Sequence, residues 1–182
     1  MRPYKPTKEE ILAAHGKSVP DVIAPDLRVL FTGINPGLYT AAIGHHFGRP
    51  GNRFWPALFG SGFTDRLLSP FEEQELLAFG LGITNLVNRA TVAADELSPM
   101  ELAAGGRELE GKVQQYGPRS VAVLGIGAFR SAFNHAKAAL GLQPDTIAGA
   151  LLWVLPNPSG LNAHYRAEDF ARLFRELRLA VE

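Results

Sequence analysis

The sequence predicts an α/β protein of one domain, with helices on both faces of a parallel sheet. Short apolar runs alternate along the chain with segments that carry helix-start signals. Strands separated by helices need crossover connections, which make neighbouring strands parallel. The apolar runs lie at residues 28–32, 81–84, 120–124 and 151–155. We therefore expect a three-layer α/β/α arrangement around a central four-stranded parallel sheet.

Capping residues mark the expected helix boundaries. In a capping box, each of two side chains accepts a hydrogen bond from the other residue's backbone N–H group. Three pairs have this spacing: Thr7–Glu10, Ser69–Glu72 and Ser98–Glu101. Gly80 and Gly117 follow two of the helices and are expected to end them.

The length and composition suit a single globular domain over residues 1–182, because the chain is 46% hydrophobic and 20% charged. We expect an N-terminal helix and lead-in over residues 1–23, an α/β core over residues 24–182, and a monomer. The apolar runs are far shorter than the roughly 20 residues that cross a bilayer. The charged N-terminal segment also lacks the apolar core of a signal peptide. The expected location is the cytoplasm, without membrane contact.

The absence of cysteine removes several chemistries together. Disulfides, thiolate nucleophiles, Cys-bound zinc and iron–sulfur clusters all need this residue. His45 and His46 are adjacent, so they cannot share a helical face as a metal pair. Ser159 lacks the Gly-x-Ser-x-Gly elbow of serine hydrolases. We expect neither a metal nor a cofactor.

The charged residues are unevenly distributed along the chain, although the formal net charge is +0. That value argues mildly against a nucleic-acid-binding protein. Two windows nevertheless contain basic residues and no acid: residues 27–64 with Arg28, Arg49 and Arg53, and residues 146–167 with His164 and Arg166. Both suit a phosphate backbone, although acid-poor loops that simply face water are an alternative.

Candidate site loops follow the predicted strands, because ligands of open parallel sheets bind beyond the carboxyl ends of the strands. After the first strand, Pro36 holds Asn35 extended between two glycines that allow close backbone approach. The Asn35 carbonyl can orient a water and its NH₂ group can donate. A turn with an Asn for local bonding explains this loop equally well. Residues 125–127 lack the third glycine of a dinucleotide fingerprint, so we interpret them as a tight turn.

Four short motifs follow one another along the chain: GINPGL at residues 33–38, NRFW at 52–55, TNLVNR at 84–89 and NPSGL at 157–161. Together they resemble the mismatch-specific uracil DNA glycosylases of the uracil-DNA glycosylase superfamily, over nearly the whole chain from residue 24. The resemblance implies a uracil-DNA glycosylase-like fold and a hydrolase of DNA repair. Such an enzyme swings a damaged base out of the duplex and hydrolyses its bond to deoxyribose, leaving an abasic site. The implied substrate is uracil opposite guanine in double-stranded DNA, with thymine and etheno-cytosine as further candidates.

The resemblance also implies the residues of a base pocket. Asn35 would position the attacking water, and Phe47 would stack on the extruded pyrimidine. Backbone groups near Ile34 and Phe47 would read the edge of the base. Thr40 would lie near its C5 position, with Tyr39 adding bulk that disfavours thymine. Asn157 completes this pocket, at a position where superfamily members that bear an aspartate in place of Asn35 have histidine.

The fourth motif is implied to contact DNA. Leu161 would fill the stack that the base has left, on a loop braced by prolines, while Gly160 and Asn162 would contact the widowed guanine. A turn that packs Leu161 into the core is the alternative. Contacts to the DNA backbone would come from Arg49, Arg53, Ser159 and Arg166. We therefore expect the loops of Asn35 and Leu161 to meet around one site.

The amide at position 35 predicts slow chemistry, because a general base contributes roughly 10² to 10⁴ in rate and Asn35 cannot act as one. Asp95 is the only Asp in the segments after the four strands, so we hypothesise that it assists water activation. A solvated residue before the helix at Ser98 is the alternative. No Lys is placed to form a Schiff base, so no strand-cutting step is expected. A lesion-binding protein and a small-molecule nucleotide hydrolase remain open as rival functions.

Overall fold

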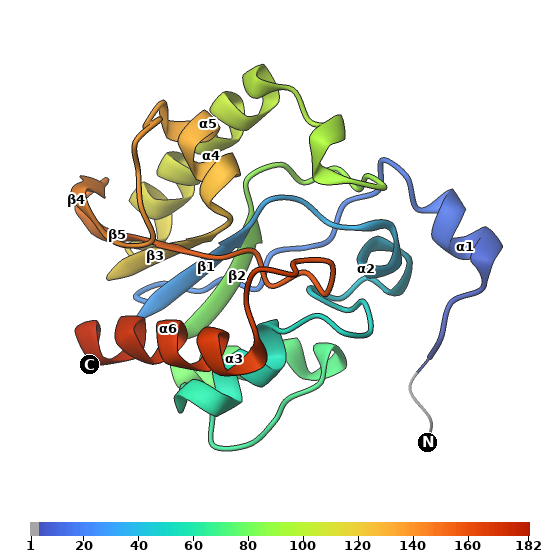
Figure 1. Ribbon diagram of the computed structural model, residues 1–182, viewed down its shortest axis with the longest axis horizontal. Helices are drawn as coiled ribbons and strands as arrows, with labels where there is room; N and C mark the ends of the chain where they lie inside the picture. The colour runs from blue at the N-terminus through green and yellow to red at the C-terminus, as the bar shows by residue number, and fades with distance from the viewer. Residues whose placement is uncertain (1–3) are drawn as a thin grey trace.

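A computed structural model describes residues 4–182 and shows one mixed sheet of five strands (Figure 1). The strand order is β2-β1-β3-β5-β4. The strands are β1 (Val29–Gly33), β2 (Leu81–Asn85), β3 (Ser120–Leu124), β4 (Gly141–Ile147) and β5 (Ala150–Leu155). The four predicted strands are confirmed within one residue at each end, and they pair in parallel.

The prediction of a purely parallel, four-stranded sheet is wrong because it misses β4. This strand pairs antiparallel with β5 at the edge of the sheet, with a register shift between Leu142 and Thr146. Its sequence includes Pro144 and Asp145, both exposed, and so shows no apolar run. Proline is tolerated in a strand at an edge, where its missing N–H group leaves no ladder bond unmade.

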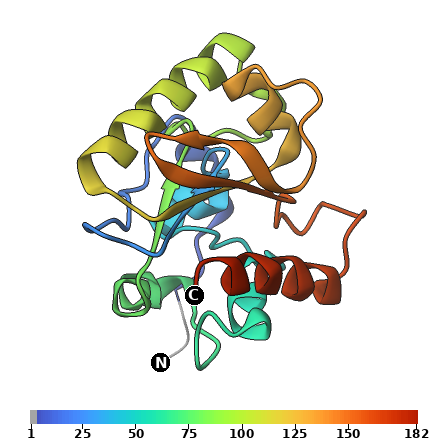
Figure 2. The same ribbon diagram turned by 90° about the vertical axis from the view of Figure 1, so that its left-hand side faces the viewer.

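Helices cover both faces of the sheet, which confirms the three layers (Figure 2). One face packs against α3, α6 and η1, and the other against α4 and α5. The helices are α1 (Lys8–Ala13), α2 (Leu38–Ile43), α3 (Phe54–Ser61), α4 (Pro99–Tyr116), α5 (Ile126–Phe133) and α6 (Ala167–Ala180), with 3₁₀ segments η1 (Pro70–Phe79) and η2 (Ala94–Glu96). Every residue of β1, β2 and β3 is buried, as expected for strands covered on both sides.

The predicted helix boundaries are largely confirmed. Two capping boxes are formed, Thr7–Glu10 and Ser98–Glu101, and two glycines end helices in the left-handed conformation, Gly80 and Gly117. At Ser69, the Glu72 carboxylate accepts the backbone N–H group at 2.8 Å, but a 3₁₀ helix follows.

The predicted N-terminal segment of residues 1–23 is described from residue 4 onwards. It includes α1, which packs on α2, and an isolated antiparallel bridge between Val22 and Ile83 of β2. Lys112 Nζ donates to both Asp21 Oδ2 at 2.7 Å and Thr84 Oγ1 at 2.8 Å, which ties the lead-in to α4 and β2. Among the described helices, none has the length and hydropathy needed to cross a bilayer.

Gly105 of α4 is expected to be intolerant of a side chain. A Cβ atom there would lie 2.3 Å from the backbone oxygen of Leu86, in the segment that follows β2. Gly105→Ala should therefore lower the free energy of unfolding by about 1–3 kcal/mol through overpacking. Gly111→Ala is the matched control in the same helix, because no atom lies within 4 Å of its Cβ position. This control should raise the free energy of unfolding by about 0.5–1 kcal/mol. Urea unfolding measures both values, and stabilisation by both substitutions would contradict the close approach.

Candidate functional site

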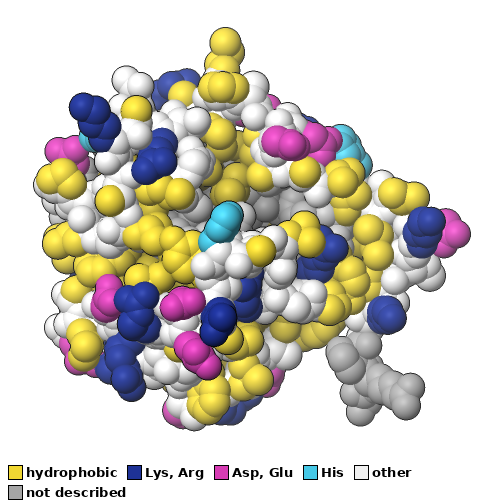
Figure 3. Space-filling model, in the orientation of Figure 1, with side chains coloured by type: hydrophobic (Ala, Val, Ile, Leu, Met, Phe, Trp, Pro, Cys, Tyr) yellow, Lys and Arg dark blue, Asp and Glu magenta, His cyan; other side chains and the backbone are white. Residues whose placement is uncertain are grey.

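A cavity of about 300 Å³ opens at the carboxyl edge of the parallel strands, where the molecular surface is hollowed (Figure 3). Segments that are far apart in the sequence line it. They are residues 33–37 after β1, residues 46–52, Asn85 at the end of β2, residues 91–94, and residues 157–161 after β5, with contributions from Thr40 and Leu124. The segments after three of the four predicted strands therefore meet here, whereas residues 125–127 do not line the cavity.

The orientation of the Asn35 amide is set by its hydrogen bonds. Its Nδ2 donates to the backbone oxygen of Arg89 and to Thr91 Oγ1, both at 2.8 Å. The Thr91 hydroxyl donates to the backbone oxygen of Ala93 at 2.8 Å, so its oxygen must accept from Asn35. Both N–H groups of the amide are thus used on the loop after β2. The carbonyl oxygen of Asn35 is left as the group that can accept a hydrogen bond from a molecule in the cavity.

An aromatic ring in an unusual backbone conformation forms another wall. Phe47 has a φ of +52°, in the left-handed region that aromatic residues rarely adopt, and its ring stacks on Phe54 at 4.1 Å between centroids. Gly33 makes room for it. A Cβ atom at Gly33 would lie 3.4 Å from the Phe47 ring and 2.5 Å from Asn85 Oδ1. Because Gly33 has no side chain, the Phe47 ring and the Asn85 amide can both pack closely against its Cα atom.

Asn85 is a residue that sequence analysis did not include in the site. It ends β2, is 7% exposed and lines the cavity. Its Nδ2 is buried and has no hydrogen-bond partner among the described residues. An unpaired buried donor costs about 1–3 kcal/mol, so such groups are uncommon outside functional sites. A polar residue directly after an apolar strand, at the edge where ligands bind, was the signal that could have found it.

The cavity has little charge. Asn35, Asn52, Asn85 and Asn157 give it four amides, and none of its described lining residues is acidic. His46 is buried and its Nε2 contacts the backbone oxygen of Pro20 at 2.8 Å. Burial lowers the pKa of His46, against the opposing effects of this bond and of nearby carboxylates, so the ring is neutral at pH 7. Such a pocket suits an uncharged ring whose edge carries hydrogen-bonding groups.

The loop after β5 presents an apolar side chain to solvent at the rim of the cavity. Leu161 is 75% exposed, which contradicts the alternative that it packs into the core. The loop is held by its own polar groups: the Ser159 N–H group donates to Asn157 Oδ1, and Asn162 Nδ2 donates to the Asn157 backbone oxygen, both at 3.0 Å. A braced loop that exposes a leucine is suited to contact an apolar partner surface.

Comparison with known proteins identifies the family. The model of the family described as "Uracil DNA glycosylase superfamily" matches residues 20–178. The chain belongs to the uracil DNA glycosylase superfamily. Members of this superfamily are DNA glycosylases, which are hydrolases, so membership supports a DNA glycosylase role.

A solved structure has a similar fold. A solution NMR structure described as that of a "putative Uracil DNA glycosylase" from Methanosarcina acetivorans matches with a TM-score of 0.58 and 17% identity. The match covers 90% of this chain and 98% of that chain. At this identity the similarity supports the shared fold alone.

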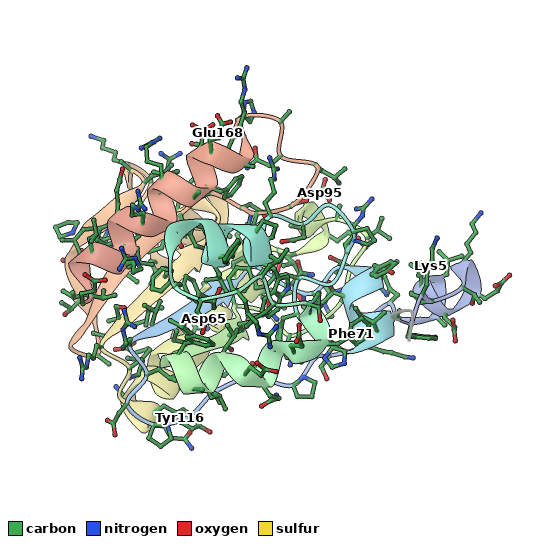
Figure 4. All side chains as sticks on the ribbon, turned by 90° about the horizontal axis from the view of Figure 1, so that it is seen from below. Lys5, Asp65, Phe71, Asp95, Tyr116 and Glu168 are labelled. Carbon is green, nitrogen blue, oxygen red and sulfur yellow. The ribbon has the colours of Figure 1, made fainter. Side chains whose placement is uncertain are left out.

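The structure brings many of the predicted site residues of this superfamily member together. The predicted residues on the cavity are Ile34, Asn35, Thr40, Phe47, Arg49, Asn157, Ser159 and Leu161. Tyr39 is not among the residues that line the cavity. Asp95 is exposed on η2 (Figure 4). It directly follows lining residues 91–94 and does not line the cavity itself.

The basic residues predicted to contact DNA have different surroundings. Arg49 lines the cavity and is exposed, and Arg166 is exposed just before α6. Arg53 is half-buried, and its guanidinium donates to backbone oxygens of the loop after β5. Arg28 packs beside Gly80, at the opposite edge of the sheet. Among the described residues, no three His, Asp or Glu side chains converge as a metal site would require.

Removal of the buried imidazole should change how stability depends on pH. The folded protein holds the pKa of His46 below its unfolded value of ~6.5. Below that pH the unfolded chain binds a proton that the folded chain does not, so stability should fall as the pH drops from about 7 to 5.5. His46→Gln should reduce this slope, measured by urea unfolding across the range. His164→Gln, which removes an exposed imidazole, should stay closer to the wild-type slope. An unchanged slope in His46→Gln would contradict the neutral buried ring.

Proposed function

We propose that this protein is a monofunctional, metal-free DNA glycosylase of base excision repair that excises uracil from mismatched double-stranded DNA. G:U pairs are the proposed substrate, with thymine and etheno-cytosine as further candidate bases. The observation that carries this proposal is that the Asn35 amide and the exposed Leu161 border one cavity, which has no acidic residue among its described lining and also contains the unpaired Nδ2 of Asn85. This combination fits a base that has left a DNA stack better than it fits a free nucleotide, because the exposed apolar side chain of Leu161 at the rim would have no partner on a free nucleotide.

The pocket supplies the contacts that an extruded uracil needs. Phe47 offers a ring face for stacking. The buried Nδ2 of Asn85 can donate to O4 of uracil, whereas cytosine carries an amino group at that position and would leave the donor unpaired. Backbone groups near Ile34 and Phe47 are proposed to read the remaining edge. Thr40 lies on the cavity and is proposed to face the C5 position.

The chemical step is proposed to depend on positioning. The bond from the sugar carbon to the base nitrogen breaks through an oxocarbenium-like state, and a water oriented by the free carbonyl oxygen of Asn35 bonds to that carbon and releases a proton to the solvent. The base leaves with a negative charge, which fixed N–H groups such as Asn85 Nδ2 can stabilise. Asp95 remains a proposed helper in water activation, because it directly follows the lining residues on η2.

Contacts to the duplex are proposed for the loop after β5. Leu161 fills the space that the base has left, and the neighbouring Gly160 is exposed at the same tip, where it can meet the widowed guanine. The backbone N–H of Asn162 donates to the Ser159 oxygen at 3.0 Å, so Asn162 has less freedom for that contact. Arg49 and Arg166 are proposed to contact phosphates.

A second candidate function is a lesion-binding protein that recognises the base without removing it. It is favoured by one specific observation: none of the described residues lining the cavity carries a carboxylate that could accept a proton from water. The two candidates share the same substrate contacts and differ in whether the bond to the sugar is broken.

A substrate panel under single-turnover conditions tests the proposal. Labelled G:U, A:U and G:T duplexes, a G:etheno-cytosine duplex and single-stranded uracil DNA are incubated with the protein and then treated with alkali. Alkali-labile product from G:U is expected, and Asn35→Ala should slow its formation on the order of 10²-fold, because the attacking water is no longer positioned. Asp95→Ala tests the proposed role of Asp95 in water activation. Full single-turnover activity of this variant would contradict that role. No product from any uracil substrate, with a retained gel shift on G:U, would favour the lesion-binding protein.

Leu161→Ala should weaken cleavage of paired uracil more than cleavage of single-stranded uracil. Only the paired base leaves a gap in a stack, so only there does the lost side chain remove about 1–3 kcal/mol of apolar contact. The ratio of the two single-turnover rates measures the effect. Leu151→Ala is a control, because Leu151 is also an exposed leucine but lies on β5 away from the cavity. Equal losses of Leu161→Ala on both substrates would contradict the role in the duplex.

A further inference from the structure

Arg53 connects the NRFW motif to the loop that carries Leu161. Its Nη2 donates to the backbone oxygens of Ser159 at 2.5 Å and Asn162 at 2.6 Å, and its Nη1 donates to the backbone oxygen of Tyr165. These three carbonyl groups lie on both sides of Leu161 in the sequence. The guanidinium also lies over the ring of Phe170, 4.7 Å from its centre, which fixes its plane.

The backbone of the same motif holds the loop at further points. The Arg53 N–H group donates to the backbone oxygen of Pro158 at 2.9 Å. Gly160 lies so close to Gly51 that a Cβ atom at Gly160 would be 2.9 Å from the Gly51 oxygen. Residues 51–53 therefore contact the loop immediately before and immediately after Leu161. A loop held in this way does not have to be ordered when DNA binds, which removes an entropic cost of binding.

We infer that Arg53 is a positioning residue that holds residues 157–165 in the conformation that projects Leu161. The inference deepens the proposed function and depends on it for the activity measurement. Arg53 thus acts through the loop. It does not contact DNA phosphate, the role that its place in an acid-free window suggested, because its Nη groups are directed at backbone oxygens.

The chemistry of the contacts explains why arginine is needed. Three carbonyl oxygens are reached by one rigid, planar group with several N–H donors, and a lysine ammonium is a point charge that cannot match this fork. Lysine keeps the positive charge, so Arg53→Lys separates the loss of the fork from the loss of charge. Arg53→Gln removes both.

The first test measures the loop directly, by hydrogen–deuterium exchange of the full-length protein without DNA. In both Arg53→Lys and Arg53→Gln, amides of residues 159–165 should exchange at least about tenfold faster than in the wild type, while amides of β1 and β3 keep their protection. Arg49→Gln is the matched control, since Arg49 is an exposed arginine on the same cavity. It should leave exchange in the loop unchanged. Wild-type exchange of the loop in both Arg53 variants would overturn the inference.

The second test separates a loop-holding role from a phosphate contact. Affinity for a G:U duplex is measured over a range of salt concentrations, where each lost phosphate contact lowers the slope of log K against log[salt] by about 0.9. Arg53→Lys and Arg53→Gln should bind more weakly with the wild-type slope, while Arg49→Gln should show the smaller slope. A slope reduced by about 0.9 in Arg53→Gln and restored in Arg53→Lys would overturn the inference in favour of a phosphate contact.

The third test uses the reaction. Both Arg53 variants should lose at least about tenfold more activity on paired than on single-stranded uracil, a factor that corresponds to ~1.4 kcal/mol. Equal losses on the two substrates would contradict positioning of Leu161. If the wild-type protein excises no uracil at all, the proposed function fails. The exchange measurement needs neither DNA nor activity, so it decides the role of Arg53 in the loop in that case too.

Discussion

The two hydrogen bonds from the Asn35 amide to the loop after β2 are the contacts on which the rest of the site depends. They join the segments that follow two neighbouring strands and leave the Asn35 carbonyl oxygen as the side-chain group that can accept a hydrogen bond in the cavity. The loop that accepts these bonds is in turn hydrogen-bonded to the N-terminal segment. The Gly16 N–H group donates to the Ala90 oxygen at 2.8 Å, and the Ala90 N–H group donates to the Lys17 oxygen at 2.9 Å. Residues before the family match thus help to orient the central amide of the site.

Three locally unfavourable features are concentrated around this amide. Phe47 has a left-handed backbone, Asn85 has a buried donor without a partner, and Leu161 is a leucine held in solvent. Each costs free energy in the isolated protein, and a ligand in the cavity could offset at least the cost at Asn85. The two well-packed layers on either side of the sheet supply the stability that tolerates them. Locally unfavourable residues that gather at one place are typical of functional sites.

The amides of the cavity, which has no acidic residue among its described lining, connect the proposed recognition of a base to the proposed chemistry. Amides can orient a water and pair with the edge of an uncharged ring, but they cannot take a proton from the water. Rate must then come from extruding the base, holding the water in line and placing N–H groups where the departing base becomes negative. In the proposed function such a site gives up speed, and the braced loop of Leu161 is proposed to add selectivity for a base that was already poorly paired.

The sequence by itself determined what neighbouring residues control: four strands, two capping boxes, and the polar loops that follow the strands, because apolar runs and caps act within a few positions. Only the tertiary structure decided the rest. The edge strand with Pro144 pairs with β5, and the Asn85 side chain lines the cavity where Gly33 leaves room for it. The acid-free window around Arg53 predicted a contact to DNA phosphate. In the fold, its guanidinium donates to backbone oxygens of residues more than 100 positions away in the sequence. The spacing of neighbouring residues cannot predict contacts between residues so far apart in the sequence, since only tertiary packing brings them together.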